Sequence, residues 1–332
     1  MSTSTLQPAE YLNFLIASPR QVTACEAARC QANSTTPHAH DAYNRLLQRL
    51  EPDPAQLWIE AEPLVQRTQG VLILDDSVLD KPYAKKMELV TYVWSGKHHR
   101  VVQGIDLITL LWTDGKWHVP CDYGVYDKAD GLTKNDHFRA LLKTAKERGF
   151  QPQCVLFDSW YASLANLKLI REQGWHWLTR LKSNRLVNWN RTKLQPLREL
   201  ELAATGTVVW LKGYGEIKVF LMVAANGDKE YWATDNLELT EAQRAELAHQ
   251  SWQIEEYHRG IKQVTNIEHC QMRSARAQRN HIGLALRAFL RFEYQAIKTG
   301  VHWLMSKWKI TRSAVTQYLE KPLFALPKCA SA

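Results

Sequence analysis

The sequence predicts a mixed α/β fold, with a five-stranded sheet flanked by helices and helical regions at both ends of the chain. Two short, wholly apolar runs at residues 71–74 and 154–157 are typical of strands buried on both faces. A hairpin followed by strand–helix units is the element order of a mixed sheet. The 332 residues and 45% hydrophobic content are ample for a core.

The N-terminal region, residues 1–69, is expected to be helical. Apolar residues recur there at helical intervals, as in Tyr11, Leu12, Phe14 and Leu15, while the polar stretch 31–40 predicts a loop. The helical pattern alone does not show whether this region binds a partner or packs on the rest of the chain.

The central scaffold is predicted over residues 70–182 and 229–282. After the strand at 71–74, strands at 103–112 and 116–123 flank an Asp-Gly turn. A helix at 134–148 precedes the strand at 154–157, and a helix at 164–173 precedes a strand at 175–181. The scaffold resumes with a strand at 231–235 and one long helix at 241–264.

Two further regions complete the predicted organisation. Residues 183–228 interrupt the strand–helix alternation with hairpin strands at 207–211 and 217–223, and predict a β-rich insertion. Residues 283–332 predict a helical, aromatic and basic C-terminal region.

Charge and cysteine usage narrow the class of protein. The surplus of 42 Lys and Arg over 34 Asp and Glu gives a net charge of +8, which favours a polyanionic partner. No apolar run reaches 18 residues and the N-terminus lacks an export pattern, so we expect a cytoplasmic protein without membrane contact. The six cysteines lack zinc-site spacing and are expected to be reduced, with no structural zinc.

Acidic residues follow the two apolar strands. Asp75 comes directly after the run at 71–74 and Asp158 directly after the run at 154–157. If these strands are neighbours, both acids emerge at one edge of the sheet. Convergent carboxylates are suitable ligands for the paired Mg²⁺ ions that support phosphoryl transfer.

The segment 252–263 predicts an amphipathic helix. At about 100° per residue, Glu255, Arg259 and Lys262 share one stripe with Trp252 at its margin. An apolar stripe on another side would dock the helix on the sheet. The helix could present an acid and phosphate-binding cations, or could be an ordinary surface helix with charge pairs.

Three motifs resemble those of insertion-sequence DDE transposases, in particular the subgroup with a β-strand insertion between the second Asp and the Glu. They are Asp75-Asp76-Ser77, Phe157-Asp158-Ser159-Trp160-Tyr161, and Trp252-x-Ile-Glu255-x-x-His-Arg-x-x-Lys262-Gln. The resemblance implies an RNase H-like fold, catalysis and metal binding by Asp75, Asp158 and Glu255, and dependence on Mg²⁺ with Mn²⁺ as substitute. It also implies cleavage of double-stranded DNA at terminal inverted repeats and strand transfer into target DNA by a homodimer in a synaptic complex. Because an equivalent region binds element ends in many relatives, residues 1–69 either bind DNA ends or pack on the catalytic domain.

The resemblance leaves residue-level alternatives. The Asp-x-Ser form of the first motif selects Asp75, with Asp76 and Ser77 in supporting positions. The spacing to Lys262 selects Glu255 over Glu256. His258 is a further supporting candidate in the third motif.

The sequence also departs from the subgroup. The Tyr and Arg that the subgroup carries seven and four residues before the Glu are Ala248 and Ser251 here. Relatives that cut through a hairpin intermediate stack a Trp of the insertion on a flipped base. Trp189 and Trp210 are the candidates, although a core position is the more frequent role of Trp.

Basic residues around the three motifs predict the DNA surface. The DNA-binding candidates are Arg259, Lys262, Trp252, Lys81, Arg180, Lys182 and Arg273. The alternatives to a transposase are a DNA-binding protein of the same fold that has lost catalysis, and an RNase H-like nuclease that cuts but never joins. When bound to DNA, the protein would be associated with the nucleoid.

Overall fold

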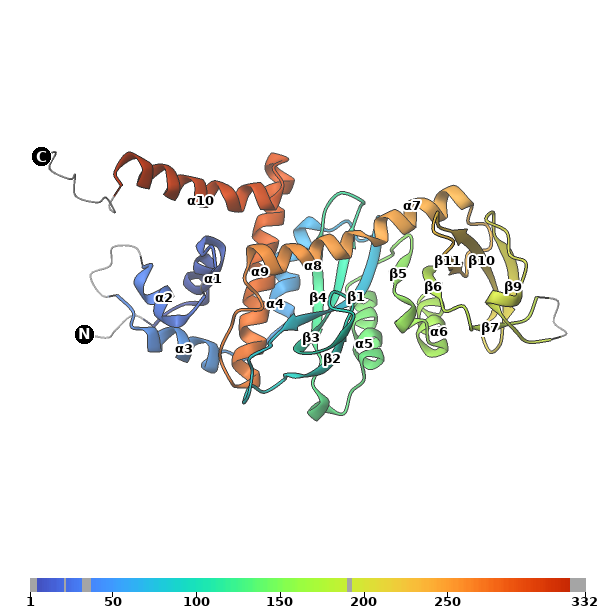
Figure 1. Cartoon of the computed structure of the whole chain (residues 1–332), viewed down its shortest axis with the longest axis horizontal. Helices are drawn as coiled ribbons and strands as arrows, with labels where there is room; N and C mark the ends of the chain where they lie inside the picture. Colours follow the sequence, from blue (N-terminus) through green and yellow to red (C-terminus); the bar gives the residue numbers. More distant parts are fainter. Residues whose placement is uncertain (1–4, 21, 32–36, 190–192, 323–332) are drawn as a thin grey trace, which may run out of the picture.

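The computed structural model describes residues 5–20, 22–31, 37–189 and 193–322 (Figure 1). At its centre is the predicted mixed five-stranded sheet, in the order β4-β3-β1-β5-β6. β1 is antiparallel to β3 and parallel to β5, and β5 is parallel to β6. The strands are β1 Val71–Asp80, β3 Arg100–Thr113, β4 Val119–Val125, β5 Val155–Phe157 and β6 Trp177–Leu181.

Among the described residues the sheet has nine strands instead of the five expected, because β11 of the scaffold and β10 and β9 of the insertion extend it at one end and β2 at the other. β11 pairs with β6, β10 with β11, and β9 with β10, all antiparallel. Their bounds are β9 Thr207–Leu211, β10 Gly215–Val223 and β11 Lys229–Thr234. At the other end β2, Thr91–Ser95, pairs with β3 and was not predicted. A separate pair joins β7 Leu186–Val187 and β8 Gln195–Pro196.

β1 does not end where the sequence predicted. The expected end was residue 74, before the two acids, but β1 continues through Asp75 and Asp76 to Asp80. The reason is its partner: β3 pairs with β1 from Val71 to Asp80 without interruption. Backbone hydrogen bonds to a neighbouring strand therefore override the local polar composition.

Helices cover both faces of the sheet. α5 Lys134–Glu147 and α6 Leu164–Glu172 confirm the predicted helices, each beginning at a Thr or Ser cap. The predicted helix 241–264 is instead two, α7 Glu241–Ser251 and α8 Gln253–Val264, which meet at Trp252. Short 3₁₀ turns are η1 Glu62–Leu64, η2 Lys128–Asp130, η3 Ser159–Tyr161 and η4 Leu197–Glu199.

The N-terminal helices pack on the long C-terminal helix α9, beside which they lie in Figure 1. Tyr11 Oη lies 2.9 Å from His281 Nδ1, and Asn280 Nδ2 donates to the carbonyls of Leu47 and Leu50 at 2.8 Å. Their apolar residues join one continuous core with the sheet. The helices are α1 Pro8–Ala17, α2 Ala24–Arg29, α3 His40–Arg49, α4 Ala55–Ala61, α9 Ala275–Thr299 and α10 Trp303–Glu320.

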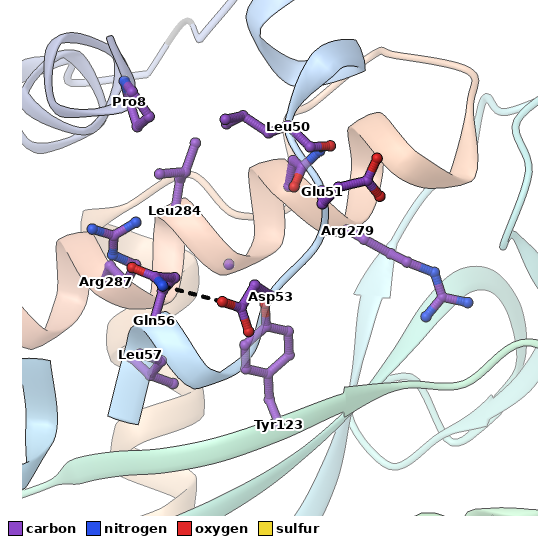
Figure 2. A pocket seen from close by; sticks show the side chains of 12 residues that line it. Pro8, Leu50, Glu51, Asp53, Gln56, Leu57, Tyr123, Arg279, Leu284 and Arg287 are labelled. Atoms are coloured by element: carbon purple, nitrogen blue, oxygen red, sulfur yellow. Dashed lines mark hydrogen bonds between the residues drawn. The ribbon is translucent and has the colours of Figure 1, made fainter. Parts of the chain in front are cut away.

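A cavity of about 320 Å³ lies at this helical contact (Figure 2). It is lined from α9 by Arg279 and Arg287, from the segment between α3 and α4 by Asp53, and from β4 by Tyr123. None of the three motif acids lines it.

Two sequence expectations concern features outside the sheet. Within the described residues, no helix combines the length and apolarity needed to cross a bilayer. The thiols of Cys25, Cys30, Cys121, Cys154 and Cys270 are free, as expected, and Cys329 lies outside the described residues. The helical prediction for the C-terminal region likewise extends past the last described residue.

Candidate active site

Asp75 lies in the middle of β1, on the sheet face that α8 covers. It is paired with Thr109 of β3, and the Thr109 side chain lies close to Tyr257 of α8. Directly paired residues of antiparallel strands share a face. Because successive side chains of a strand alternate, Asp76 faces the opposite side.

Asp158 follows β5 at the position level with Asp75. The parallel register pairs Leu74 with Phe157, so the next residue on each strand is one of the two acids. Asp158 Oδ1 accepts a hydrogen bond of 2.5 Å from the Ser159 amide at the start of η3. The same oxygen lies 3.7 Å from Arg180 Nη2, and the side chain is 44% exposed.

Glu255 lies in the first turn of α8 and is exposed. The helix is held in place by Ile254, Tyr257 and Ile261, which are buried and form the predicted apolar stripe. The Tyr257 ring also packs edge-on against Phe289 of α9, with centroids 5.2 Å apart. α8 thus carries its acid on a side of the helix separate from its buried stripe.

The electrostatics of Asp75 connect the three acids. Burial raises the pKa of Asp75 well above its ordinary value, and the negative charges of Asp76, Asp158 and Glu255 raise it further, against a hydrogen bond from the Asp76 backbone. The three neighbouring charges are all negative, so they disfavour the ionised form of Asp75. A bound cation would relieve the repulsion.

The donor chemistry of these residues fits a hard divalent cation, because all three offer carboxylate oxygens. In the part of the chain that the structure describes, however, no three acidic, His or Cys side chains gather closely enough to hold one metal ion. Asp158 is turned toward the Ser159 amide and Arg180 instead. The acids are brought together by the sheet but are not arranged as a coordination shell.

The alternative acids have other partners. Asp76 lies 2.7 Å from Lys134 Nζ and accepts a 2.6 Å hydrogen bond from Tyr161. Glu256 lies 3.3 Å from His118 Nε2. These contacts favour Asp75 and Glu255 over their neighbours as the acids that face the site.

The remaining motif residues are internal. Ser77 is 9% exposed and His258 is 5% exposed. Burial lowers the pKa of His258 to about 3, helped by the nearby charge of Lys262, so His258 is neutral at ordinary pH. Both side chains are supporting residues of the fold around the site.

The predicted DNA-binding residues fall into two groups. Most are on the surface: Arg259, Arg180, Lys182, Arg273 and Trp252 are exposed. Lys81 is a correction, since it is 6% exposed and its ammonium donates to the carbonyls of Glu268 and Cys270 at 2.7 and 2.8 Å. Lys262 is also engaged, lying 2.6 Å from the Val78 carbonyl and 3.2 Å from Glu268.

Three tryptophans of the second motif and the insertion are more exposed than Trp usually is. Trp189 is 48% and Trp210 37% exposed, so the core position that their residue type favoured is wrong for both. Sequence reasoning did not single out Trp160, which is 58% exposed and has Lys182 Nζ 5.7 Å from its ring centroid. Its place two residues after Asp158 was the available signal.

Sequence reasoning also missed the charged pair behind β1. Lys134 Nζ lies 2.5 Å from Asp106 Oδ2 while it also contacts Asp76. Burial and the charge of Asp76 raise the pKa of Asp106 to about 7, although Lys134 opposes the shift. Asp106 falls inside a long apolar strand pattern, and that isolated acid was the only sequence signal.

The sheet order β4-β3-β1-β5-β6 is that of an RNase H-like fold. The chain belongs to the transposase DDE domain family, whose model matches residues 67–291. It is therefore a transposase, of a family whose members use divalent metal ions.

Two solved structures are similar to the chain. One is the piggyBac transposase in a synaptic complex with hairpin DNA, with a TM-score of 0.51, 12% identity, and coverage of 98% of this chain and 76% of that one. The other is the Drosophila P element transposase in a strand transfer complex, with a TM-score of 0.27, 11% identity, and coverage of 58% and 48%. No curated protein matches the sequence. At these identities the first likeness establishes the fold.

Proposed function

We propose that Asp75, Asp158 and Glu255 are the catalytic carboxylates of this transposase and that they hold Mg²⁺, with Mn²⁺ as substitute. The observation that carries the proposal is the register of β1 and β5, which puts Asp75 and Asp158 level on neighbouring strands under the helix that carries Glu255. The raised pKa of Asp75, caused by burial and by the charges of the neighbouring acids, is consistent with this arrangement. When bound, divalent ions would activate the attacking oxygen and offset charge on the phosphate.

The proposed substrate is double-stranded DNA at the ends of the element, followed by target DNA. Water attacks a phosphodiester phosphorus, the bond to the 3′ oxygen breaks, and a 3′-hydroxyl is released. That hydroxyl then attacks a second phosphodiester, whose own 3′ oxygen leaves. Arg180 and Arg259 are exposed near the acids and are suited to contact the backbone phosphates.

A hairpin route is supported by one feature of the insertion and by one similar structure. The indoles of Trp189 and Trp210 are exposed, as a base-stacking role requires. The similar piggyBac transposase was solved with hairpin DNA. We further propose that the protein acts as a homodimer that brings two element ends together, and that residues 70–182 and 229–282 form the catalytic domain around the insertion 183–228.

The test is cleavage of DNA that carries the flanking ends of the element. We expect Asp75→Ala, Asp158→Ala and Glu255→Ala each to abolish Mg²⁺-dependent cleavage while end binding, measured by gel shift, is retained. Glu246→Ala is the matched control, because this exposed acid lies on the preceding helix α7. Full cleavage by any of the three variants would remove that residue from the catalytic set.

A second candidate function is favoured by one observation, the lack of three ligand side chains around a common point among the described residues. A DNA-binding protein that has lost catalysis would retard element-end DNA in a gel-shift assay but would not nick it in the presence of Mn²⁺. A nuclease of this fold would cut without forming strand-transfer products. The same assay therefore separates all three functions.

A further inference from the structure

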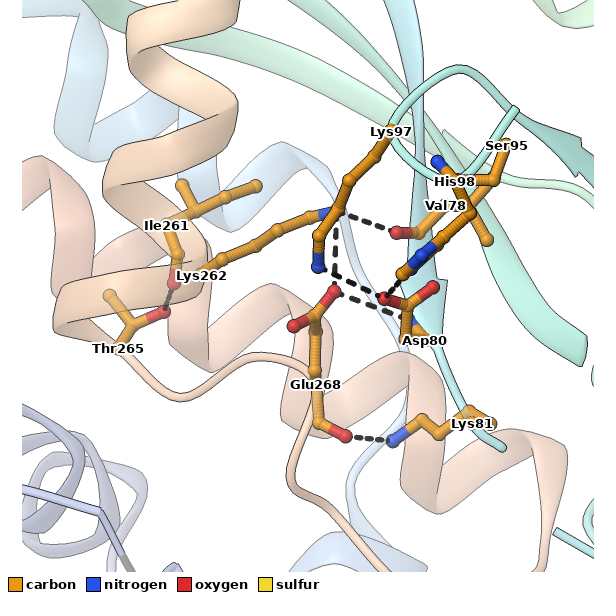
Figure 3. Close-up of polar contacts among 10 residues, drawn as sticks. All are labelled: Val78, Asp80, Lys81, Ser95, Lys97, His98, Ile261, Lys262, Thr265 and Glu268. Atoms are coloured by element: carbon orange, nitrogen blue, oxygen red, sulfur yellow. Dashed lines mark hydrogen bonds and ion pairs between the residues drawn. The ribbon is translucent and has the colours of Figure 1, made fainter. Parts of the chain in front are cut away.

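The signature lysine of α8 is bound inside the protein. Lys262 Nζ donates to the carbonyl of Val78 at 2.6 Å and lies 3.2 Å from Glu268 Oε1, and its side chain is 20% exposed (Figure 3). An ammonium has three donors, and a carbonyl and a carboxylate already receive it here. This arrangement differs from that of a cation directed into solvent toward DNA.

The partners of Lys262 and Glu268 lie on one edge of β1. On that side β5 pairs with β1 only as far as Leu74, and along this edge no described strand pairs with the rest of β1. In a strand, the carbonyl of one residue and the amide two residues later point to the same side. Val78 offers such a carbonyl, and the Asp80 amide donates to Glu268 Oε1 at 3.2 Å.

Lys262 and Glu268 therefore take the place of a missing strand neighbour. The lysine donates to the free carbonyl, the glutamate accepts from the free amide, and an ion pair joins the two side chains. Unpaired backbone groups at a strand edge are unfavourable when they are shielded from water. We call the pair Lys262 and Glu268 the edge clamp.

The edge clamp is spaced to align two of the proposed catalytic acids. Lys262 is seven residues beyond Glu255 on α8, a rise of about 10 Å. Val78 is three residues beyond Asp75 on β1, which also spans about 10 Å. The two spans are therefore of similar length. The contact of Lys262 with Val78 fixes one end, and at the other end Glu255 is close enough to Asp75 for its charge to raise the pKa of Asp75.

We propose that Lys262 is a positioning residue, which with Glu268 fixes α8 on the edge of β1 so that Glu255 reaches the site of Asp75. The alternative is that Lys262 leaves these partners and contacts a DNA phosphate. The inference rests on the proposed function, because that function is what makes Glu255 and Asp75 the acids to be positioned. The clamp itself can be tested without DNA or metal.

The first measurement separates positioning from phosphate contact. Lys262→Met and Glu268→Gln are compared with Arg259→Gln, a variant of an exposed cation on the same helix. Binding to element-end DNA is measured in Ca²⁺ over a series of salt concentrations. We expect both clamp variants to keep the affinity within about twofold and to leave unchanged the slope of the log binding constant against log salt concentration. Loss of a phosphate contact at Arg259 should reduce the magnitude of that slope by about one.

The second measurement concerns the acids. Manganese binding, followed by electron paramagnetic resonance, should be about tenfold weaker in Lys262→Met and Glu268→Gln, because Glu255 is displaced from Asp75. Cleavage should fall by about 10- to 100-fold, the scale expected for a displacement near 1 Å. Lys262→Arg keeps a long cationic donor and should restore most of both signals.

The third measurement is hydrogen exchange of the peptide that carries Asp80, in the protein alone. We expect faster exchange in both clamp variants and unchanged exchange in Arg259→Gln. A reduced salt slope in Lys262→Met, or wild-type exchange and metal binding in Glu268→Gln, would overturn the proposal. If the wild-type protein binds no Mn²⁺ and cuts no DNA, the catalytic assignment fails, while the exchange and salt data still decide whether Lys262 is a clamp.

Discussion

At the scale of single residues, neighbouring acids of identical chemistry have opposite environments. Asp75 and Asp76 are adjacent on β1, yet the strand directs them to opposite faces. Asp76 has Lys134 and Tyr161 as partners, and Asp75 has the negative charges of other acids. Removing the two carboxylates should therefore change stability in opposite directions.

We expect Asp75→Asn to melt at a higher temperature than the wild type at pH 7, by a few degrees. The pKa of Asp75 is raised in the folded protein, so folding takes up a proton between the unfolded and folded pKa values, and stability falls as the pH rises through that window. Asparagine does not titrate, so the variant does not lose stability as the pH rises through this window. Calorimetric scans should show the difference shrinking toward pH 4.

Asp76→Asn is the matched comparison for this measurement. It leaves Lys134 with only Asp106 for a charged partner and should lower the melting temperature at pH 7. A destabilised Asp75→Asn protein, or two variants with the same sign, would contradict the assignment of the two faces.

At the residue level, spacing alone led to one choice that the contacts support and that stays a prediction. Glu255 was preferred to Glu256 because it shares a helical stripe with Lys262, and in the structure Glu256 is directed toward His118. The partners of Lys81 and Lys262 were beyond sequence reasoning. They are backbone carbonyls of distant segments, and no residue type identifies a carbonyl that lacks a strand partner.

At the scale of elements, α8 depends on a close approach to its neighbours. Gly260 lies on its buried side, where an added Cβ would be 2.6 Å from Phe289 Cε2 and 3.2 Å from Trp303 Cζ2. Both contacts are with aromatic rings held in the core. The helix that carries Glu255 can therefore lie at its observed distance from α9 only with glycine here.

We expect Gly260→Ala to lower the free energy of unfolding by up to about 2 kcal/mol. Alanine favours the helix by about 1 kcal/mol over glycine, but overpacking a rigid contact costs about 1–3 kcal/mol. Urea denaturation measures the difference, with Gly96→Ala as control because no atom lies within 4 Å of its added Cβ. A gain in stability would show that α8 and α9 separate at little cost.

Element prediction failed where tertiary pairing decides the boundaries. The periodicity of residues 241–264 continues across Trp252, so the division into α7 and α8 was not visible in the sequence. β2 has exposed Tyr92 and Trp94 and no buried run, and it is a strand because it pairs with β3. The buried strands β1 and β5 were found because both of their faces are apolar.

At the scale of the whole molecule, the N-terminal helices and the C-terminal helix α10 contribute unequally to the core. The N-terminal helices bury Leu12, Leu15, Leu46 and Leu47 in the common core. α10 contacts the body through Trp303 and Lys307, whose ammonium binds the carbonyls of Ile16 and Ser18 at the end of α1. From Trp308 to Lys321 its residues are exposed.

Truncation should reveal this difference. Deletion of residues 1–61 removes four buried leucines, whose burial contributes on the order of 6–12 kcal/mol together, and uncovers the apolar surface of α9 on which they pack. This loss is comparable to the entire stability of a domain. We expect that protein to be insoluble or unfolded by circular dichroism. Deletion of residues 308–332 should leave the melting temperature within about 2 °C of the full chain. A folded protein lacking residues 1–61 would show that the N-terminal helices are an independent unit.

The continuity of the sheet through β11, β10 and β9 restricts how copies of this chain can diverge. A loop tolerates added or lost residues, but one residue removed from β10 would turn every later side chain of that strand to the other face. The exposed Trp210 is joined by this ladder to the strand beside β5. We therefore expect natural length changes in the turn at residues 224–228. The distance from the Trp210 indole to Asp158 should be the same in related copies of the chain.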